Sequence, residues 1–268
     1  MSLNDYMDKE TKQAFLLIIG IFLFLLIVYP LVNFQELDFS NPLSKVTDSV
    51  DQLPGGSNST ATVELQEGVD YGAVVETSEG SFTIDLFEDN APQNVRNFIA
   101  QIPKYDSADI TVQKDFLFAI EATREPSYSI PDEINANSLG LDTRTVEESD
   151  FLKELYEPGD SSTEQFAPDN LEKYGDFTLQ EFYTEVLGYE YTTDVTTRSA
   201  TKYMVYMANE GPGTNKADFF ILMAGNAPQI DGMFTPIGQV NDGFNVLDDI
   251  NKKNSGNLEV TSVKVKIL

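Results

Sequence analysis

The sequence predicts an all-β folded domain that follows one apolar segment near the N-terminus. The first observation is a series of short apolar runs rich in β-forming residues: Tyr203 to Met207, Phe219 to Met223 and Phe234 to Val240. Segments dense in turn residues separate these runs, and this alternation is typical of a β-meander. The second observation is that residues 14–32 form 19 consecutive positions without a charge. Such a run is long enough for a transmembrane helix, which needs about 20 residues.

The composition excludes several kinds of chemistry. The 268 residues carry a formal net charge of −27, which argues against nucleic acid or an anionic membrane surface as a partner. This charge indicates either a heavily solvated surface or attraction to basic segments and divalent cations. Cysteine, histidine and tryptophan are absent, so thiolate chemistry, disulfides, Cys-ligated zinc and histidine acid–base catalysis are excluded. No D-x-D-x-D-G calcium loop is present, and we expect neither a cofactor nor a bound metal.

Residues 14–32 are predicted to be an uncleaved transmembrane helix. A cleaved signal peptide is the alternative, but its apolar core would span about 7–15 residues and precede a small-x-small cleavage site. The residues that follow the apolar run offer no such site. Lys9 and Lys12 precede the run, whereas the first basic residue after it is Lys45. The positive-inside rule then places the N-terminal tail, residues 1–13, in the cytoplasm and the rest of the chain outside it, at the cell surface or in a periplasm-like space.

The rest of the chain divides into a linker and a folded domain. Residues 33–68 are predicted to be a flexible linker, because Ser, Asn, Asp, Thr, Pro and Gly dominate them. The folded domain is expected at residues 69–268. Within it, residues 141–199 are predicted to be an acidic insertion, with 15 Asp and Glu against 4 Lys and Arg, a net charge of −11. Helical spacing is present at 151–156 and 179–187. The aromatic side chains of this insertion either pack it onto the barrel or extend or gate a peptide groove.

A hairpin and a helix open the folded domain. The second strand of the hairpin places Phe82, Ile84 and Leu86 on one face. A helix should follow, with Asn90 as its N-terminal cap and Pro92 in its first turn. Its buried stripe is predicted to be Val95, Phe98, Ile99 and Ile102.

Motifs in both halves of the domain share the order and spacing of one known family. The first is ETSEGSFTIDLFEDNAPQNVRNFIA, the hairpin and helix just described. The others are Tyr105–Asp106, Ile130 to Ile134, Met207–Ala208–Asn209, Gly211–Pro212, Thr214–Asn215, Phe219–Phe220–Ile221, Asp231–Gly232 and Gly238. Together they resemble the cyclophilins, which are peptidyl-prolyl isomerases, over residues 71–140 and 200–268. The resemblance implies a closed antiparallel β-barrel of about eight strands with two capping helices. Gly243 to Ile250 would be the second of these helices, and Thr261 to Ile267 the last strand.

The resemblance also implies a site, and the chain departs from the family there. In cyclophilins an arginine donates a hydrogen bond to the prolyl nitrogen, and a glutamine supports it. Matching the motifs, with a one-residue gap, places Val112 at the arginine and Ala119 at the glutamine, so the donor is lost. Asp218 replaces a second glutamine, Gln229 the usual tryptophan and Phe234 the usual histidine. The predicted substrate-binding residues are Phe116, Leu117, Ala208, Asn209, Phe220, Ile230 and Phe234. Arg124, Arg198 or Lys202 could supply a substitute donor.

Two functions remain open from the sequence. The first is a membrane-anchored extracytoplasmic peptidyl-prolyl cis-trans isomerase that assists protein folding with impaired activity. The alternative is a non-catalytic cyclophilin-like module that binds proline-containing segments or scaffolds envelope proteins. Family resemblance favours the first, whereas the residues at the site favour the second. In both cases the expected partners are proline-containing polypeptide segments and, through residues 14–32, a membrane. The sequence does not decide whether the chain is an enzyme, nor its oligomeric state.

Overall fold

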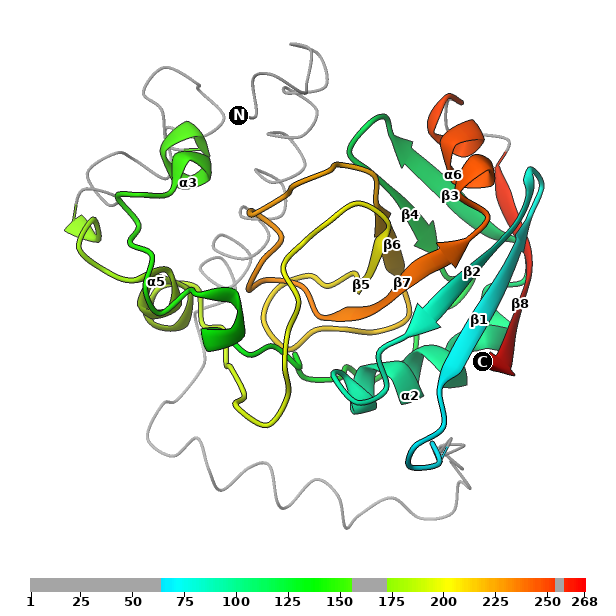
Figure 1. Ribbon diagram of the computed structural model, residues 1–268, viewed down its shortest axis with the longest axis horizontal. Coiled ribbons are helices and arrows are strands. Elements are labelled where there is room, and N and C mark those ends of the chain that lie inside the picture. Colours follow the sequence, from blue (N-terminus) through cyan, green and yellow to red (C-terminus); the bar gives the residue numbers. More distant parts are fainter. Residues whose placement is uncertain (1–63, 156–172, 254–257) are drawn as a thin grey trace, which may run out of the picture.

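The computed structural model describes residues 64–155, 173–253 and 258–268, and its centre is a closed barrel of eight antiparallel strands (Figure 1). The strands are β1 (Tyr71–Thr77), β2 (Gly80–Leu86), β3 (Ala108–Gln113), β4 (Leu117–Glu121), β5 (Met204–Met207), β6 (Phe219–Leu222), β7 (Pro236–Asp242) and β8 (Glu259–Ile267). Around the barrel they follow the order β1-β2-β7-β5-β6-β4-β3-β8, and β8 pairs with β1 to close the wall. The predicted closed barrel is therefore confirmed.

The barrel core is formed by every second side chain along each strand. Phe82, Ile84 and Leu86 of β2 face inward and are at most 4% exposed, because successive side chains of a strand point to opposite faces. Phe118 and Ile120 of β4 join them from across the barrel, fully buried. The alternation of apolar and polar residues in the sequence thus predicted correctly which side chains of β2 face the barrel interior.

Two helices pack against this core, as expected. Helix α2 (Pro92–Gln101) contributes Val95 and Phe98, and helix α6 (Phe244–Asn251) contributes Leu247 and Ile250, all fully buried. Ile99 and Ile102, the other members of the predicted stripe, are partly buried against the same core. Short 3₁₀ turns lie at η3 (Ile102–Lys104) and η4 (Asn137–Leu139).

The cap of α2 differs from the expectation. Ala91 is the N-cap residue and makes no side-chain cap, while the Asn90 side chain donates to the carbonyl of Thr196 instead. The free N–H groups of the first turn are bound by Glu133, whose carboxylate accepts from Gln93 N at 3.1 Å and from Asn94 N at 2.8 Å. The Glu133 carboxylate, distant in the sequence, therefore accepts the hydrogen bonds that Asn90 was expected to accept. Its negative charge is also favourable at the positive end of the helix dipole.

Strands β5, β6 and β7 do not form the meander that the sequence pattern predicts. β5 pairs with both β6 and β7, so the order in the wall is β7-β5-β6, and β6 does not pair with β7. A meander would need a short turn after β6, but residues 223–235 separate the two strands. This long connection, in which Asp231–Gly232 forms the expected turn, returns across the barrel end so that β7 can lie beside β5.

The described residues of the segment 141–199 lie beside the barrel and, together with Ile134, Ala136 and Leu139, form a hydrophobic cluster separate from the barrel core (Figure 1). The segment contains helix α3 (Asp150–Leu155) and helix α5 (Leu179–Glu185), where the sequence predicts helical spacing. Thr178 and Glu181 form a capping box at the start of α5. The buried members of this side cluster are Ile134, Ala136, Leu139, Leu141, Val146, Leu152, Leu179, Phe182, Tyr183 and Tyr189.

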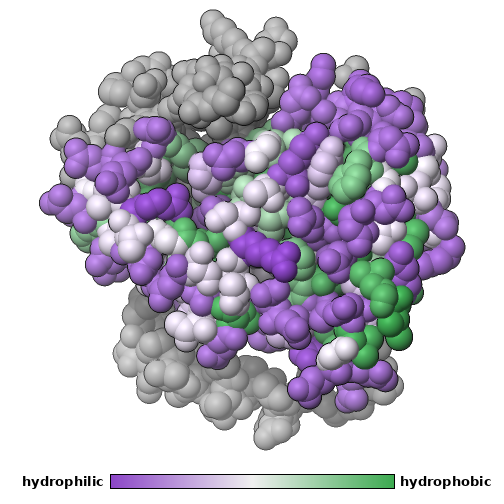
Figure 2. All heavy atoms as spheres, viewed as in Figure 1, coloured by the Kyte–Doolittle hydropathy of each residue, from purple (hydrophilic) through white to green (hydrophobic). Residues whose placement is uncertain are grey.

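Hydrophilic residues dominate the face of the molecule in Figure 2. Across the three described ranges, no helix is both long enough and apolar enough to span a membrane. The predicted anchor, residues 14–32, and the predicted linker up to residue 63 lie outside those ranges, so both stay predictions.

Candidate functional site

Strands β4, β5 and β6 carry apolar side chains on both faces of the barrel wall. Every residue of β5 and β6 is buried. Val205, Met207, Phe219 and Ile221 face the barrel core, while Met204, Tyr206, Phe220 and Leu222 belong to a second cluster on the outside. The outer face of a barrel normally meets water, so an apolar outer face indicates that other parts of the chain cover it.

We call this second group the outer-face cluster. Its buried members are Phe87, Phe116, Ala200, Met204, Tyr206, Phe220, Leu222, Ala227 and Ile230; Leu117, Ala119, Phe151, Ala208, Ala224 and Phe234 pack against it partly buried. Six of the seven predicted substrate-binding residues are in this group, although they come from four separate parts of the chain. Phe116, Phe220 and Ile230 are only 4%, 4% and 5% exposed.

Phe220 is the central ring of the outer-face cluster. The Tyr206 ring stacks on it with centroids 5.2 Å apart and planes at 15°, and the Phe234 ring meets it edge-on, also at 5.2 Å. Both contacts are favourable aromatic geometries. Phe234, which the sequence match aligns with a histidine, therefore contributes an aromatic ring and no hydrogen-bonding group.

Asn209, the seventh predicted residue, uses its side chain within the protein. It is 4% exposed, and its amide donates to the carbonyl of Met233 at 3.0 Å and to the Asn215 side chain at 3.3 Å. Its Oδ1 accepts from the backbone of Gly211 at 3.2 Å. Only its backbone groups could therefore meet a peptide. The side chain instead holds the loop between β5 and β6.

Val112 does not share a face with these residues. In the β3–β4 pair Val112 lies opposite Phe118, and both pack on the barrel core. Thr111 lies opposite Ala119 and is exposed on the outer face, where its hydroxyl donates to Glu121 at 3.2 Å. Side chains alternate along a strand, so the outward positions of β3 are Thr111 and Gln113. The sequence could have indicated Thr111, because it lies between two apolar residues, Ile110 and Val112.

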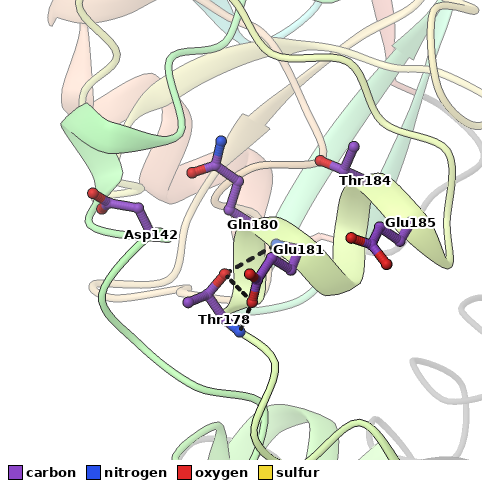
Figure 3. A pocket seen from close by; sticks show the side chains of 6 residues that line it. All are labelled: Asp142, Thr178, Gln180, Glu181, Thr184 and Glu185. Carbon is purple, nitrogen blue, oxygen red and sulfur yellow. Dashed lines mark hydrogen bonds between the residues drawn. The ribbon is translucent and has the colours of Figure 1, made fainter.

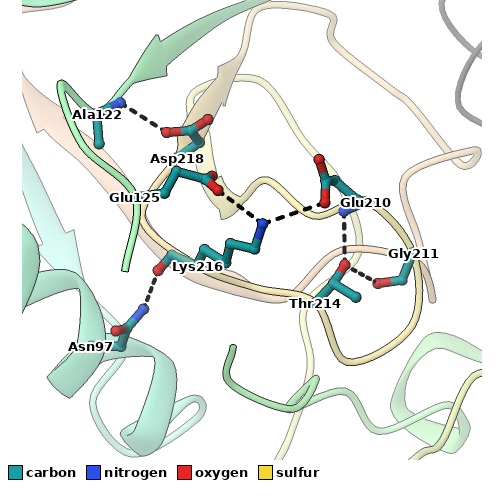
Figure 4. Close-up of polar contacts among 8 residues, drawn as sticks. All are labelled: Asn97, Ala122, Glu125, Glu210, Gly211, Thr214, Lys216 and Asp218. Atoms are coloured by element: carbon teal, nitrogen blue, oxygen red, sulfur yellow. Dashed lines mark hydrogen bonds and ion pairs between the residues drawn. The ribbon is translucent and has the colours of Figure 1, made fainter. Parts of the chain in front are cut away.

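Asp218, which the sequence match aligns with a glutamine, links the start of β6 to the end of β4. Its Oδ1 accepts from the backbone N–H of Ala122 at 2.8 Å (Figure 4). Burial raises the pKa of its carboxyl, and that bond to Ala122 works in the opposite direction. Beside it, Lys216 forms ion pairs with Glu125 at 2.8 Å and Glu210 at 3.4 Å (Figure 4). These contacts connect the loop after β4 with the loop that precedes β6.

Gln229 is the residue that the sequence match aligns with a tryptophan. It is 3% exposed, and its Oε1 has no hydrogen-bond partner among the described residues. A buried carbonyl oxygen without a partner is unfavourable by about 1–3 kcal/mol.

The three candidate substitute donors lie in different places. Lys202 forms an ion pair with Asp248 at 3.5 Å and lies over the Tyr203 ring. Arg124 is exposed beyond the end of β4. The Arg198 guanidinium lies over the ring of Phe87, 4.4 Å from its centroid, and Phe87 belongs to the outer-face cluster. Of these three, Arg198 is the cation that contacts the cluster.

A separate pocket of about 370 Å³ lies against α5 (Figure 3). Its lining residues are Asp142, Thr178, Gln180, Glu181, Thr184 and Glu185. Glu181 is already engaged with Thr178 in the capping box. In the described part of the chain, no three carboxylates are arranged to hold a metal ion.

The chain is similar to known proteins over most of its folded domain. The family model described as "Cyclophilin type peptidyl-prolyl cis-trans isomerase/CLD" matches residues 73–268. Peptidyl-prolyl cis-trans isomerase CYP18-1 of Arabidopsis thaliana is 45% identical over 53 residues, which are 20% of this chain and 32% of that protein. Peptidyl-prolyl cis-trans isomerase-like 3 of Gallus gallus is 40% identical over 55 residues, 20% of this chain and 34% of that protein. These alignments span about a third of each relative.

Two solved structures resemble the chain at low sequence identity. One is a cyclophilin type peptidyl-prolyl cis-trans isomerase of Cryptosporidium parvum, at 14% identity and a TM-score of 0.44, covering 74% of this chain and 98% of that one. The other is the same enzyme in the presence of the dipeptide Ala-Pro, at 16% identity and a TM-score of 0.45, covering 73% and 98%.

Proposed function

Because the chain belongs to the cyclophilin type peptidyl-prolyl cis-trans isomerase family, we propose that it is a membrane-anchored extracytoplasmic member that binds proline-containing segments and isomerises them slowly, assisting protein folding. The observation that carries the proposal is the outer-face cluster, which gathers Phe116, Leu117, Phe220 and Ile230 on the outside of the barrel. A proline ring needs such an apolar site. The substrate backbone would be held by the main chain of Ala208 and Asn209.

The lack of an arginine on β3 accounts for the proposed slow turnover. Rotation about a prolyl bond has a barrier of about 20 kcal/mol, because the nitrogen shares its lone pair with the carbonyl. A hydrogen bond to that nitrogen weakens the sharing and lowers the barrier. Here Val112 faces the core, and the outer face of β3 and β4 offers Thr111 and Ala119 in its place. Loss of one preorganised donor typically lowers the rate by 10²–10³.

The same observation favours a second candidate, a non-catalytic module that binds proline-containing segments or scaffolds other envelope proteins. The two functions differ in turnover. We expect the full-length protein, purified in mild detergent, to bind a blocked Ala-Pro peptide while isomerising it at least ~100-fold more slowly than an intact cyclophilin site would. Binding without any turnover would select the second function. Absence of binding at millimolar peptide would exclude both, and turnover at ordinary family rates would overturn the impairment.

The membrane location and the insertion belong to the same proposal. The uncharged run at residues 14–32, preceded by Lys9 and Lys12, supports an anchor with residues 1–13 in the cytoplasm and the domain outside. We further propose that residues 141–199 are an acidic insertion into the barrel domain. Protease added to intact cells should digest the domain. A mature form that begins near residue 33, or a domain protected in intact cells, would contradict this topology.

A further inference from the structure

Phe151 joins the segment 141–199 to the outer-face cluster. It is partly buried and packs against both the side cluster and the outer-face cluster. The next residue of α3, Leu152, is 3% exposed and belongs to the side cluster. Successive residues of an α-helix point about 100° apart, so α3 can anchor itself with Leu152 while it presents Phe151 to the barrel. The other residues packed partly buried on the outer-face cluster come from the barrel strands and their adjoining loops.

The central side chains of the outer-face cluster are shielded from solvent. Phe116, Phe220 and Ile230 are at most 5% exposed, although they lie on the outside of the barrel wall. A site ready to accept a proline ring would leave part of these side chains open to solvent. Their burial means that neighbouring side chains occupy the space where the ring would lie. Phe151 and Phe234 are the largest of the partly buried side chains that pack there.

The segment is also fixed to the loop that carries two of the proposed binding residues, Ile230 and Phe234. The Tyr191 hydroxyl donates to the carbonyl of Gly232 at 2.9 Å, and Met233 packs on the side cluster. Gly232 has a φ of +86°, and a Cβ placed there would lie 2.5 Å from Leu141. The positive φ and the close approach together favour glycine, and these contacts connect the loop to the side cluster, to which Leu152 of α3 belongs.

We propose that Phe151 is a specificity-determining residue that covers the proline site and must be displaced by an incoming peptide. The proposal rests on the proposed function, because it assumes that the outer-face cluster receives the proline ring. The benzyl group of Phe151 and the proline ring compete for the same apolar surface. Peptides bind only if their contacts with the cluster are more favourable than those of Phe151, so Phe151 selects among proline-containing segments.

The absence of tryptophan from the chain provides a direct test. Phe151→Trp in the full-length protein introduces a single tryptophan at the cover, and Phe177→Trp places one in the side cluster, against which Phe177 packs. We expect a blocked Ala-Pro peptide to shift the emission of F151W to longer wavelength, because the ring is released into water. The emission of F177W should not change, and an Ala-Ala peptide should shift neither. A peptide that binds F151W without moving its emission would overturn the proposal.

Affinity provides the second measurement, and it separates this inference from the function on which it rests. Phe151→Ala should bind the Ala-Pro peptide about tenfold more tightly than the wild type, Phe151→Leu should lie between them, and Phe177→Ala should stay within about twofold of the wild type. If the wild type binds the peptide and both Phe151 variants bind it equally or more weakly, Phe151 does not cover the site. The proposed function is then unaffected. If neither the wild type nor the Phe151 variants bind the peptide, the proposed function fails and the cover fails with it.

Discussion

Val112 and Thr111 are neighbours on β3, but their side chains lie on opposite faces of the barrel wall. Val112→Arg would force a guanidinium toward the barrel core, and we expect a loss of more than about 3 kcal/mol in the free energy of unfolding, because the charge would have no partner there. Thr111→Arg with Ala119→Gln places the same groups opposite each other on the outer face. This double variant should keep the wild-type free energy within about 1 kcal/mol. Urea denaturation measures both values.

The double variant should also gain turnover. An arginine at 111 beside a glutamine at 119 would restore a donor on the outer face, and we expect the rate of proline isomerisation to rise by tenfold or more toward the 10²–10³ that one such donor supplies. Thr111→Lys with Ala119→Gln is the matched control, because it adds the charge without the planar fork of arginine. A fully folded Val112→Arg variant with higher activity than the double variant would show that the arginine position is Val112 after all.

Asp231 is the side chain whose protonation should govern the stability of the loop beside the site. Burial raises its pKa from 3.8 to about 6, while the N–H of Ala200 and the charge of Arg144 lower it. The folded protein therefore holds this proton more tightly than the unfolded chain, and ionisation opposes folding. The penalty is absent below about pH 4, grows between about pH 4 and 6, and reaches about 3 kcal/mol above that window.

Asp231→Asn removes the titration but keeps an oxygen that can accept from Ala200. We expect the variant to be more stable than the wild type at pH 7.5, by up to about 3 kcal/mol, with the difference vanishing as the pH falls to 4. Urea denaturation of both proteins across this range gives the difference at each pH. A difference that does not change with pH would contradict the assigned pKa.

The candidate site shows how far single residues could be assigned from the sequence. Motif order located Phe116, Leu117, Ala208, Phe220 and Ile230, and the structure brings these residues into one cluster. Motif order could not establish which side chains of β3 face outward, because the match there needs a one-residue gap. A slip of one residue moves every side chain of a strand to the other face. Local patterns therefore predicted which apolar residues cluster, but not which residues of β3 share the outer face with them.

Among the elements, helix α2 was predictable, but its cap was not. The amphipathic stripe and Pro92 indicate the helix, whereas Glu133, which caps it, lies 40 residues from Gln93 in the sequence. No local rule points to so distant a carboxylate. The pairing of β7 with β5 instead of β6 could not be predicted for a similar reason. Periodicity identifies strands, and only the closure of the barrel decides which of them meet.

Glu133→Ala should destabilise the protein by about 2–3 kcal/mol, because it leaves the part-buried N–H group of Gln93 and the buried N–H group of Asn94 without this acceptor. Glu133→Gln keeps one acceptor oxygen and loses the charge, so we expect about half that loss. Glu67→Ala, at an exposed position before β1, is the matched control and should have almost no effect. Thermal and urea denaturation of the three variants test this. A Glu133→Ala variant as stable as the control would mean that the backbone groups find other partners.

At the scale of the whole chain, the charge balance is the dominant feature. The chain has 44 Asp and Glu against 17 Lys and Arg, and the ion pairs of the described residues lie at the surface, such as Lys252–Asp249 with side chains 70% and 57% exposed. A surface pair contributes about 0–1 kcal/mol. Repulsion among the excess carboxylates should therefore outweigh these pairs.

Added salt should stabilise the protein, because screening weakens the net repulsion more than it weakens a few surface pairs. The Debye length falls from about 30 Å at 0.01 M to about 10 Å at 0.1 M and about 3 Å at 1 M. We expect Tm at pH 7.5 to rise by several degrees between 10 mM and 0.5 M NaCl, measured by calorimetry on the full-length protein. At pH 4.1, which is about the isoelectric point, the net charge is near zero, and the same titration should change Tm little. A similar rise at both pH values would attribute the stabilisation to general salt effects on apolar burial, and a fall at pH 7.5 would show that specific ion pairs outweigh the repulsion.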